Sequence, residues 1–269
     1  MNFLRILVRG ANDVGSAVAH RLFMAGYAVI IHETPQPATA RRRMSFTDAV
    51  FDGQALLNGV TAHHTNDLHL IDSLLNEHAV IPVTVENIYN VIEHTQPQVL
   101  IDARMRKHRQ PDPQLDLASL TIGLGPNFIA GVTTHLAIET ARGEALGSII
   151  SKGATSPLQG EPQSIAGHAR DRYVYSYEAG TFYTSHQIGD SVQQGEEIAR
   201  LNTVPLYAPI PGILRGLTHD GVPVGLRTKV IEVDPRTQGA QISGIGERPA
   251  RIAEGVITAI QSWEADHVH

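Results

Sequence analysis

The chain has 269 residues, of which 42% are hydrophobic and 18% are charged. Such a composition is that of a globular protein with one large or two modest domains, and it excludes intrinsic disorder and fibrous architectures. Lysine and arginine together number 21 against 27 aspartate and glutamate residues, which gives a formal net charge of −6. This balance argues against nucleic acid or an anionic membrane surface as the main partner.

The chain contains no cysteine. Disulfides, cysteine-ligated zinc or iron–sulfur clusters and a thiol nucleophile are therefore excluded. No apolar stretch approaches the roughly 18 residues that span a bilayer, so no membrane partner is expected. Residues 1–10 are interrupted by Arg5 and Arg9, which is unlike a signal peptide, and we expect a cytoplasmic location.

The first residues have the order of a dinucleotide-binding βαβ unit. A short apolar run over 4–8 predicts a strand, and a glycine turn over 10–15 follows it. Apolar residues at helical spacing cover 14–25, and a second β-rich run covers 27–31, just before Glu33. Strand, glycine turn, helix, strand and acidic residue together predict a Rossmann-like N-terminal domain in an α/β protein.

The glycine turn is the first candidate binding site. In such a unit Gly10 permits the tight turn, Gly15 permits close approach of helix and strand, and the helix N-terminus binds a phosphate. Glu33 stands where a carboxylate holds a ribose hydroxyl pair. Asn12, next to Asp13, replaces the middle glycine of the usual fingerprint. The turn binds a dinucleotide, binds another anion, or binds nothing, and the sequence leaves these alternatives open.

A basic loop over 40–44 follows the second predicted strand and enters a short helix. Arg41 and Arg42 form either a solvated face or an anion clamp, because guanidinium groups suit phosphate. Loops after parallel strands gather at one sheet edge, so we expect both arginines to meet Arg9 and the turn at Gly10 there.

The α/β pattern continues with a strand, a helix and a strand, at 80–85, 88–94 and 99–102. A further strand over 120–122 runs into a second glycine loop that contains Gly123 and Gly125. This loop is either a rigid anion-binding turn or a tight connection. If it binds an anion, we expect it to share one pocket with the first glycine turn.

His135 and Glu139 are weak catalytic candidates. They share one face whether residues 132–140 form a strand or a helix. Such a pair acts as an acid–base or metal pair, or forms an ordinary hydrogen bond. The other histidines lack ligand spacing, and no metal ligand is assigned.

The composition changes near residue 151. Residues 151–170 are rich in Gly, Pro, Ser and Gln and predict a linker or long loop. Short strands and close turns follow. The stretches at 188–192, 195–196 and 208–212 resemble the barrel-sandwich hybrid of biotinyl and lipoyl carrier domains. In those carriers a hairpin presents a lysine, but the matching residues 202–206 contain none, so no covalent biotin or lipoate is expected.

Helical spacing of apolar residues returns over 249–263 and predicts a C-terminal helix. We expect it to pack on the N-terminal sheet or at the domain junction. The predicted organisation is a Rossmann-like domain, a linker, an all-β domain and a terminal helix, at 1–150, 151–170, 171–247 and 248–269.

Nearly the whole chain resembles the YqeB-like family of selenium-dependent molybdenum hydroxylase system proteins. The matching stretches are 8–14, 40–42, 45–46, 49–50, 122–126, 138–140, 142–143, 189–192 and 233–236. This resemblance implies an accessory role in the maturation of molybdenum hydroxylases such as xanthine and CO dehydrogenases. It also implies a hydroxylase or its maturation machinery as partner, and a homo-oligomer is compatible with it.

The residues and the resemblance together favour a protein that binds a nucleotide or a molybdopterin-type cofactor, since both carry phosphate. An NAD(P)-dependent oxidoreductase and a docking protein with a vestigial pocket are the alternatives. The expected binding residues are Arg9, Gly10, Asn12, Asp13, Gly15, Glu33, Arg41, Arg42, Gly123 and Gly125.

Overall fold

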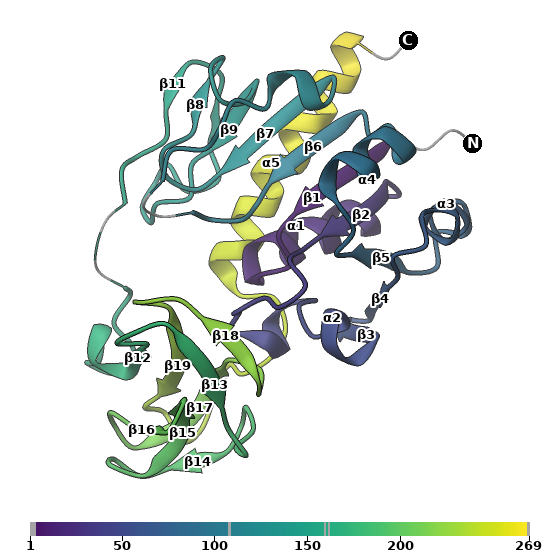
Figure 1. Ribbon diagram of the computed structural model, residues 1–269. Coiled ribbons are helices and arrows are strands. Elements are labelled where there is room, and N and C mark those ends of the chain that lie inside the picture. Colours follow the sequence, from purple (N-terminus) through teal and green to yellow (C-terminus); the bar gives the residue numbers. More distant parts are fainter. Residues whose placement is uncertain (1–3, 107–108, 159, 161, 268–269) are drawn as a thin grey trace. The chain divides into compact units, whose positions relative to one another are not determined.

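Figure 1 shows a computed structural model of the chain, which describes residues 4–106, 109–158, 160 and 162–267. The described chain forms two compact units. The first consists of the chain up to residue 35, residues 45–159 and the chain from residue 245 onward. The second consists of residues 36–44 and 160–244. None of the described helices is long and apolar enough to cross a membrane.

The first unit is built on a nine-stranded sheet within the described residues. Across the sheet the strands are β10 (Ile149–Ile150), β9 (Leu136–Ile138), β7 (Leu120–Leu124), β6 (Val99–Asp102), β1 (Arg5–Arg9), β2 (Ala28–His32), β5 (Ile81–Thr84), β4 (Val60–His64) and β3 (Gln54–Leu57). The inner strands run parallel, whereas β10 and β3 are antiparallel to their neighbours. A separate two-stranded sheet pairs β8 (Ile129–Ala130) with β11 (Gly153–Ala154).

Helices cover both faces of this sheet (Figure 1). They are α1 (Asp13–Met24) and α5 (Glu247–His267) on one face and α3 (Leu68–Glu77) and α4 (Ile88–Thr95) on the other, with the short α2 (Ala49–Asp52) before β3. Strand β1 illustrates why both faces are covered. Successive side chains of a strand point to opposite faces, and those of β1 are apolar on both. Ile6 and Val8 belong to the core cluster with α1 and α5, whereas Leu7 packs with Ile71 and Val91 of α3 and α4.

The strand order reverses at β1. From β1 the chain proceeds to β2 and β5 on one side, and it then crosses to β6 and β7 on the other side. In open parallel sheets, ligands bind beyond the carboxyl ends of the strands at such a reversal. The loops after β1 and β6 are therefore the part of the first unit to search for a site.

The second unit contains two four-stranded antiparallel sheets in its described residues. One has the order β12 (Tyr173–Tyr175), β19 (Lys229–Asp234), β17 (Gly212–Leu217) and β14 (Ser191–Val192), and the other β16 (Val204–Tyr207), β15 (Glu197–Leu201), β13 (Gly180–Tyr183) and β18 (Val222–Val224). Residues 36–44 join this unit through the carbonyl of Ala40, which accepts a 2.7 Å hydrogen bond from the backbone N–H of Leu217.

The predicted fold class, a Rossmann-like N-terminal domain with a C-terminal all-β barrel-sandwich hybrid and terminal helix, is wrong in its C-terminal part, and the Rossmann-like description of the N-terminal part stays a prediction. The chain is a mixed α/β protein whose large sheet carries antiparallel strands at both edges. A barrel-sandwich hybrid with a terminal helix is not evident. The all-β unit includes residues 36–44, far upstream in sequence, and the terminal helix α5 belongs to the first unit. The predicted domain boundaries stay a prediction.

Helix α5 confirms the helix predicted over 249–263 and extends it at both ends. Its buried face includes Ile252, Val256 and Ile260, which join the core cluster shared with α1 and β1. Gly255 lies so close to Gly147 that an added Cβ would overlap the carbonyl oxygen of Gly147. Close backbone approach therefore fixes α5 against the turn between β9 and β10.

Candidate functional site

The turn after β1 has the geometry that the sequence predicts for its glycines. Gly10 adopts φ +112°, a conformation that favours glycine, and its N–H donates to the carbonyl of His32 at 2.8 Å. An added Cβ at Gly15 would overlap the carbonyl oxygen of Gly10. The two glycines therefore let α1 start directly against the end of β1.

Asn12 caps α1, a role that the fingerprint does not assign. Its Oδ1 accepts hydrogen bonds from the N–H groups of Val14 at 3.0 Å and Gly15 at 3.2 Å, and its Nδ2 donates to the carbonyl of Ala103 at 2.7 Å. Asp13 is the first residue of the helix. Asn12 thus ties the helix N-terminus to the loop after β6 and uses two of the N–H groups that a phosphate would bind.

Glu33 lies against the same turn. Its Oε2 accepts a 2.7 Å hydrogen bond from the N–H of Ala11, and its Oε1 accepts one from the N–H of Thr34 at 2.7 Å. Both carboxylate oxygens therefore hold backbone groups. The predicted contact of Glu33 with a ribose stays a prediction.

Beyond the turn, four side chains form a polar chain at the carboxyl ends of β1 and β6. Arg9 and Asp102 are neighbours in the sheet register. Nη1 of Arg9 donates to Oε1 of Gln114 at 2.8 Å, and Nε2 of Gln114 donates to Oδ2 of Asp102 at 2.8 Å. Arg104 holds both oxygens of Asp102, with its Nε 2.8 Å from Oδ1. Asp102 and Gln114 are buried, whereas the Arg104 side chain is 22% exposed.

The charge at this edge is positive. Burial and, next to it, the charge of Arg104 lower the pKa of Arg9 to about 10. Burial and Arg104 likewise lower the pKa of Arg106. Burial alone would raise the pKa of Asp102, but the hydrogen bonds from Arg104 and Gln114 outweigh it and hold the pKa below the ordinary value. Arg104 therefore pairs with one ionised carboxylate, and Arg9 and Arg106 lie close enough to interact with these charges. Among the described atoms, Nε of Arg9 is buried without a hydrogen-bond partner.

Arg104, Arg106 and Gln114 were missed in the sequence. The signal was present: four of the six residues at 104–109 are Lys or Arg, in a chain of net charge −6, directly after the predicted strand over 99–102. A basic run at the carboxyl end of a parallel strand indicates an anion site when its place in the sheet is known.

The second glycine loop lies at the same edge. Gly123 is in register with Asp102 of the neighbouring strand. Gly125 lies against Met105, to which an added Cβ would come within 3.3 Å of the sulfur. Both glycines are therefore close to the Arg104–Arg106 loop, and their direct role in binding stays a prediction.

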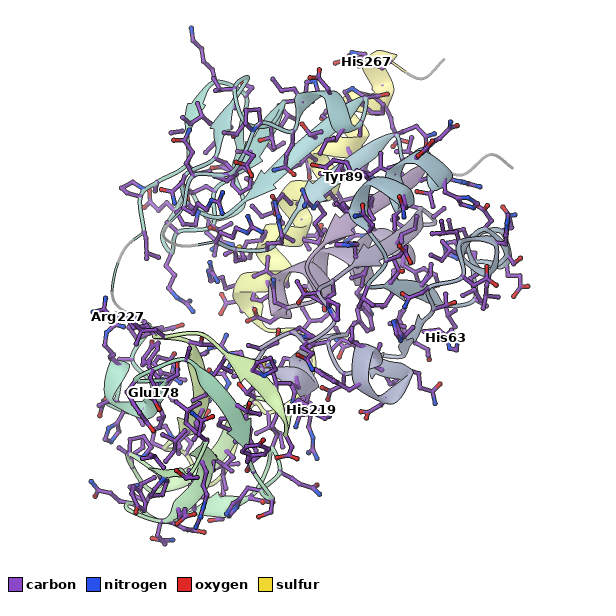
Figure 2. All side chains as sticks on the ribbon, in the orientation of Figure 1. His63, Tyr89, Glu178, His219, Arg227 and His267 are labelled. Atoms are coloured by element: carbon purple, nitrogen blue, oxygen red, sulfur yellow. The ribbon has the colours of Figure 1, made fainter. Side chains whose placement is uncertain are left out.

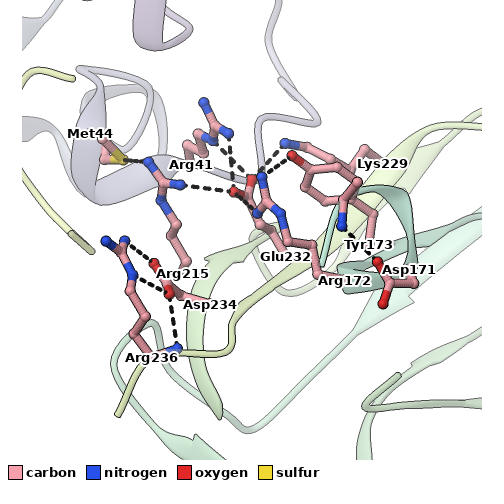
Figure 3. A network of polar contacts seen from close by, with 11 residues as sticks. Arg41, Met44, Asp171, Arg172, Tyr173, Arg215, Lys229, Glu232, Asp234 and Arg236 are labelled. Carbon is pink, nitrogen blue, oxygen red and sulfur yellow. Dashed lines mark hydrogen bonds and ion pairs between the residues drawn. The ribbon is translucent and has the colours of Figure 1, made fainter. Parts of the chain in front are cut away.

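Arg41 and Arg42 belong to the second unit. Arg41 makes a two-point ion pair with Glu232 (Figure 3), with distances of 2.8 Å from its Nε and 3.0 Å from its Nη2. Nε of Arg42 donates to the carbonyl of Leu217 at 2.8 Å. Their expected convergence with the turn at Gly10 stays a prediction.

The catalytic candidates occupy the two ends of β9. Nδ1 of His135 lies 2.9 Å from Oγ1 of Thr121. Glu139 is buried and accepts hydrogen bonds from the N–H groups of Thr140 at 2.7 Å, Ala141 at 2.7 Å and Ser156 at 2.8 Å. Burial would raise the pKa of Glu139, but these hydrogen bonds hold it below its ordinary value. His135 thus hydrogen-bonds to Thr121 of the neighbouring strand, and Glu139 holds three backbone N–H groups. Catalysis by either side chain stays a prediction.

His32, at the end of β2, supplies a pH-dependent prediction. Burial lowers its pKa to about 4, against the hydrogen bond to the carbonyl of Glu86, and the charges of Arg9 and Arg104 act in the same direction as burial. The ordinary histidine pKa is about 6.5. As the pH falls from about 6.5 to 4, His32 binds a proton in the unfolded chain but not in the folded chain. The free energy of unfolding therefore falls over this range.

We expect His32→Gln to reduce this loss, because glutamine keeps a donor for the Glu86 carbonyl and does not titrate. Urea unfolding followed by circular dichroism at several pH values measures it. The control is His69→Gln, which replaces an exposed histidine of α3. Equal pH slopes for the wild type and His32→Gln would contradict the prediction.

Comparison with known proteins gives one close relative. No protein-family model matches the chain. The chain is 35% identical over 256 residues to the uncharacterized protein YqeB of Escherichia coli strain K12, covering 95% of this chain and 47% of that protein. The chain thus spans about half the length of this relative. The identity supports a YqeB-like family, as the sequence predicts, whereas the molybdenum hydroxylase role stays a prediction.

Similarity to solved structures is faint. The ectoine utilization protein EutE (DoeB) from Ruegeria pomeroyi, with product bound, has 20% identity, covers 31% of this chain and 27% of its own, and gives a TM-score of 0.22. A succinylglutamatedesuccinylase/aspartoacylase from Rhodobacter sphaeroides is 13% identical, and the match covers 86% of this chain and 85% of that chain with a TM-score of 0.27. Such scores carry no inference about the fold or activity of this chain.

Proposed function

We propose that the chain binds a phosphate-bearing cofactor, a nucleotide or a molybdopterin-type compound, and serves as an accessory protein in the maturation of molybdenum hydroxylases. One observation supports the binding activity above all: where the strand order reverses, Arg104 pairs with the buried carboxylate of Asp102, and Arg9 is joined to it through Gln114. Arg106 is close enough to act on the charges of Arg104 and Asp102. The maturation role rests on the family resemblance of the sequence, whereas the identity to the uncharacterized protein YqeB bears on the family and not on the role.

The charge at this edge matches the ligand. Asp102 neutralises one guanidinium group and leaves two positive charges. These balance the roughly two negative charges of a phosphate monoester or a diphosphate bridge near neutral pH. The guanidinium groups bind phosphate oxygens through charge-assisted hydrogen bonds. Gln114 fixes the position of Arg9, and Asp102 fixes that of Arg104.

An aromatic ring lies near these charges. Tyr89, at the start of α4 and labelled in Figure 2, is 66% exposed and is close enough to Arg9 to influence the pKa of that guanidinium group. An exposed ring next to a group of cations can stack a nucleotide base or a pterin. The phosphate and the heterocycle of one ligand thus have separate contacts on the same edge.

The NAD(P)-dependent alternative depends on a second role for Glu33. It requires Glu33 to hold a ribose in addition to the backbone N–H groups of Ala11 and Thr34 that its oxygens accept. A nucleotide held mainly by its phosphate and its base does not need that contact.

Removal of the Arg106 charge should weaken binding of pyrophosphate by about tenfold at low salt, since one charge-assisted contact is lost. Thermal shift measures it, because stabilisation rises with ligand concentration relative to Kd. Pyrophosphate, NAD, NADP, AMP and a molybdopterin-containing extract form the panel, and adenosine is the phosphate-free comparison. The ranking of the panel identifies the class of cofactor.

Arg106→Gln is the better first variant, because Arg104→Gln would leave Asp102 buried without its ion pair. Arg200→Gln is the matched control: its guanidinium group is 56% exposed in a surface pair with Glu197 of the second unit. An unchanged response of Arg106→Gln to pyrophosphate would rule out this edge as the phosphate site. The docking-protein alternative would then be favoured.

A further inference from the structure

The last residues of four neighbouring strands form a row at the carboxyl edge of the large sheet. They are Asp102 of β6, Arg9 of β1, His32 of β2 and Thr84 of β5, which are partners in the parallel register. Register partners of parallel strands point to the same face of a sheet. Leu7, two residues before Arg9, packs in the core cluster under α3 and α4, so the row lies on that face. We call these four residues the edge row.

His32 is an inner member of the edge row. On one side its neighbour is Arg9, and the charges of Arg9 and Arg104 both act on its imidazole ring. On the other side its Nε2 lies 2.9 Å from the carbonyl oxygen of Glu86, in the loop from β5 to α4. Tyr89 follows in the first turn of α4. His32 therefore contacts the loop that carries Tyr89 and neighbours the guanidinium groups proposed to bind phosphate.

The hydrogen bond to Glu86 fixes which nitrogen of the imidazole ring carries the proton. A carbonyl oxygen only accepts, so Nε2 of His32 is protonated and donates. In a neutral ring the other nitrogen, Nδ1, then has a lone pair and is an acceptor. The ring is neutral near pH 7, because burial, together with the charges of Arg9 and Arg104, lowers its pKa to about 4. His32 is thus an uncharged acceptor beside guanidinium groups that only donate.

This acceptor is open to a ligand. Among the described residues Nδ1 of His32 makes no hydrogen bond, and it is not sealed off from solvent. Its surroundings are accessible as well, since Tyr89 is 66% exposed and the Arg104 side chain 22%. The carboxylate of Asp102, by contrast, is held by Arg104 and Gln114 through both of its oxygens. His32 therefore offers a ligand an acceptor that the described protein groups leave unused.

A phosphate oxygen does not fit against Nδ1 of His32. Such an oxygen brings negative charge and lone pairs to a nitrogen that itself has a lone pair, so the two repel. Arg104 and Arg106 are the better partners for phosphate, because they supply charge-assisted donors. The group that fits Nδ1 is an O–H or N–H donor. In a nucleotide, sugar hydroxyl groups lie between the phosphate and the base, and a pterin has an amide N–H in its ring.

We propose that His32 is a specificity-determining residue of the site at the carboxyl ends of β1 and β6. Its Nδ1 accepts a hydrogen bond from a hydroxyl or ring N–H group of the ligand whose phosphate the arginines bind. This inference rests on the proposed function and adds the part of the ligand that is recognised. The contact differs from the ribose contact of a dinucleotide-binding unit, which would fall to Glu33 against the turn at Gly10.

Isothermal titration calorimetry of the intact chain with three diphosphates tests the proposal. ADP carries sugar hydroxyl groups, dideoxyadenosine diphosphate lacks them, and inosine diphosphate has a ring amide N–H like that of a pterin. We expect the wild type to prefer a donor-bearing ligand by about fivefold, the effect of one neutral hydrogen bond. A preference for ADP over the dideoxy compound assigns the contact to a hydroxyl group. A preference for inosine diphosphate over ADP assigns it to a ring N–H.

His32→Gln should abolish this preference. Glutamine places its amide N–H where Nε2 donates to the carbonyl of Glu86, and it leaves no acceptor at the position of Nδ1. The affinity for the ligand that lacks the recognised donor should stay within about twofold of the wild type. His69→Gln, in an exposed histidine of α3, is the matched control and should keep the wild-type preference. Equal preferences in His32→Gln and the wild type, or none in the wild type, would overturn the proposal.

Nitrogen-15 nuclear magnetic resonance of the histidine rings gives a second readout on the wild type, with His32→Gln used only to assign the resonances. Saturation with the preferred diphosphate should move the Nδ1 resonance of His32 while Nε2 stays protonated. An Nδ1 resonance that does not move, or a ring that becomes doubly protonated, would overturn the proposal.

The two proposals fail in different ways. Diphosphates that bind the wild type and are weakened by Arg106→Gln, but show no preference that depends on His32, overturn this inference and leave the proposed function standing. If none of the three diphosphates binds, the proposed function fails and this inference fails with it.

Discussion

Replacing Glu232 by glutamine should destabilise the second unit by about 3–5 kcal/mol, the usual cost of removing one partner from a buried ion pair. The variant leaves Arg41, Arg172, Arg215 and Lys229 facing a neutral amide, with Glu232 itself having been fully buried. Urea unfolding followed by circular dichroism measures the change. The control is Glu197→Gln, which removes a 40% exposed carboxylate paired with Arg200 and should cost less than about 1 kcal/mol.

The same carboxylate should make the second unit sensitive to acid. Burial acts to raise the pKa of Glu232, but the charges of Lys229 and Arg41 outweigh it and hold the pKa well below the ordinary value. A depressed pKa means that its stabilisation is fully present above the ordinary glutamate pKa of about 4.3 and is lost as the pH falls below it. Glu232→Gln should therefore unfold with a weaker pH dependence below about pH 4.3 than the wild type. Parallel curves would show that Glu232 is not held as an ionised group.

Gly15→Val should unfold the first unit or destabilise it by about 3 kcal/mol or more, because overpacking against a fixed backbone cannot be relieved by a side-chain rotation. An added Cβ at Gly15 overlaps the carbonyl oxygen of Gly10, and its next contacts are also at the Gly10 carbonyl and Ala103. Thermal unfolding followed by circular dichroism measures the loss.

Gly225→Ala is the matched control for this substitution. An added Cβ there meets only Oγ1 of Thr228, at 3.8 Å, which is an ordinary contact. We expect it to change stability little. A folded Gly15→Val with wild-type stability would show that α1 does not start against the Gly10 turn. The expected loss of folding also makes Gly15→Val a poor probe of ligand binding, for which Arg106→Gln is suited.

The local elements were predictable because their signals are local. An apolar run, a glycine turn and helical spacing specify β1, α1 and β2, and the structure confirms each to within one residue at either end. Helix α4 and strand β6 were found for the same reason. Strands β3 and β4 were missed, because the segment 54–64 has no clear alternation. Helix α3 was missed although its signal was present, since Leu68, Ile71 and Leu75 recur at helical spacing after the capping residue Asp67.

The assembly of the elements was not predictable from these signals. The predicted fold class failed because residues 36–44 join strands that follow residue 160. The packing of α5 on the N-terminal sheet was expected and is confirmed. Arg41 shows the same limit at the level of one side chain, since its partner Glu232 is 191 residues away in sequence. A run of basic residues predicts an anion or solvent as its partner. The residues around Arg41 give no indication that its partner is a buried carboxylate far away in the sequence.

The candidate site likewise has features that the sequence indicated and features that only the structure shows. The glycines of the first turn were read correctly from their spacing. Asn12 and Glu33 also hold backbone groups of the turn itself, a role that the sequence did not indicate, and their contacts with a ligand stay predictions. Arg104 and Arg106 could be recognised as candidate binding residues only once the structure showed that β6 lies next to β1, where the strand order reverses.

A crystal structure of the chain grown with tungstate tests the central claim most directly. Tungstate is a tetrahedral dianion like phosphate, and the anomalous scattering of tungsten locates it without ambiguity. The account predicts a tungsten peak within hydrogen-bonding reach of Arg104 and Arg106, at the carboxyl ends of β1 and β6. Tungsten bound elsewhere on the chain, with none beside Arg104 and Arg106, would contradict it.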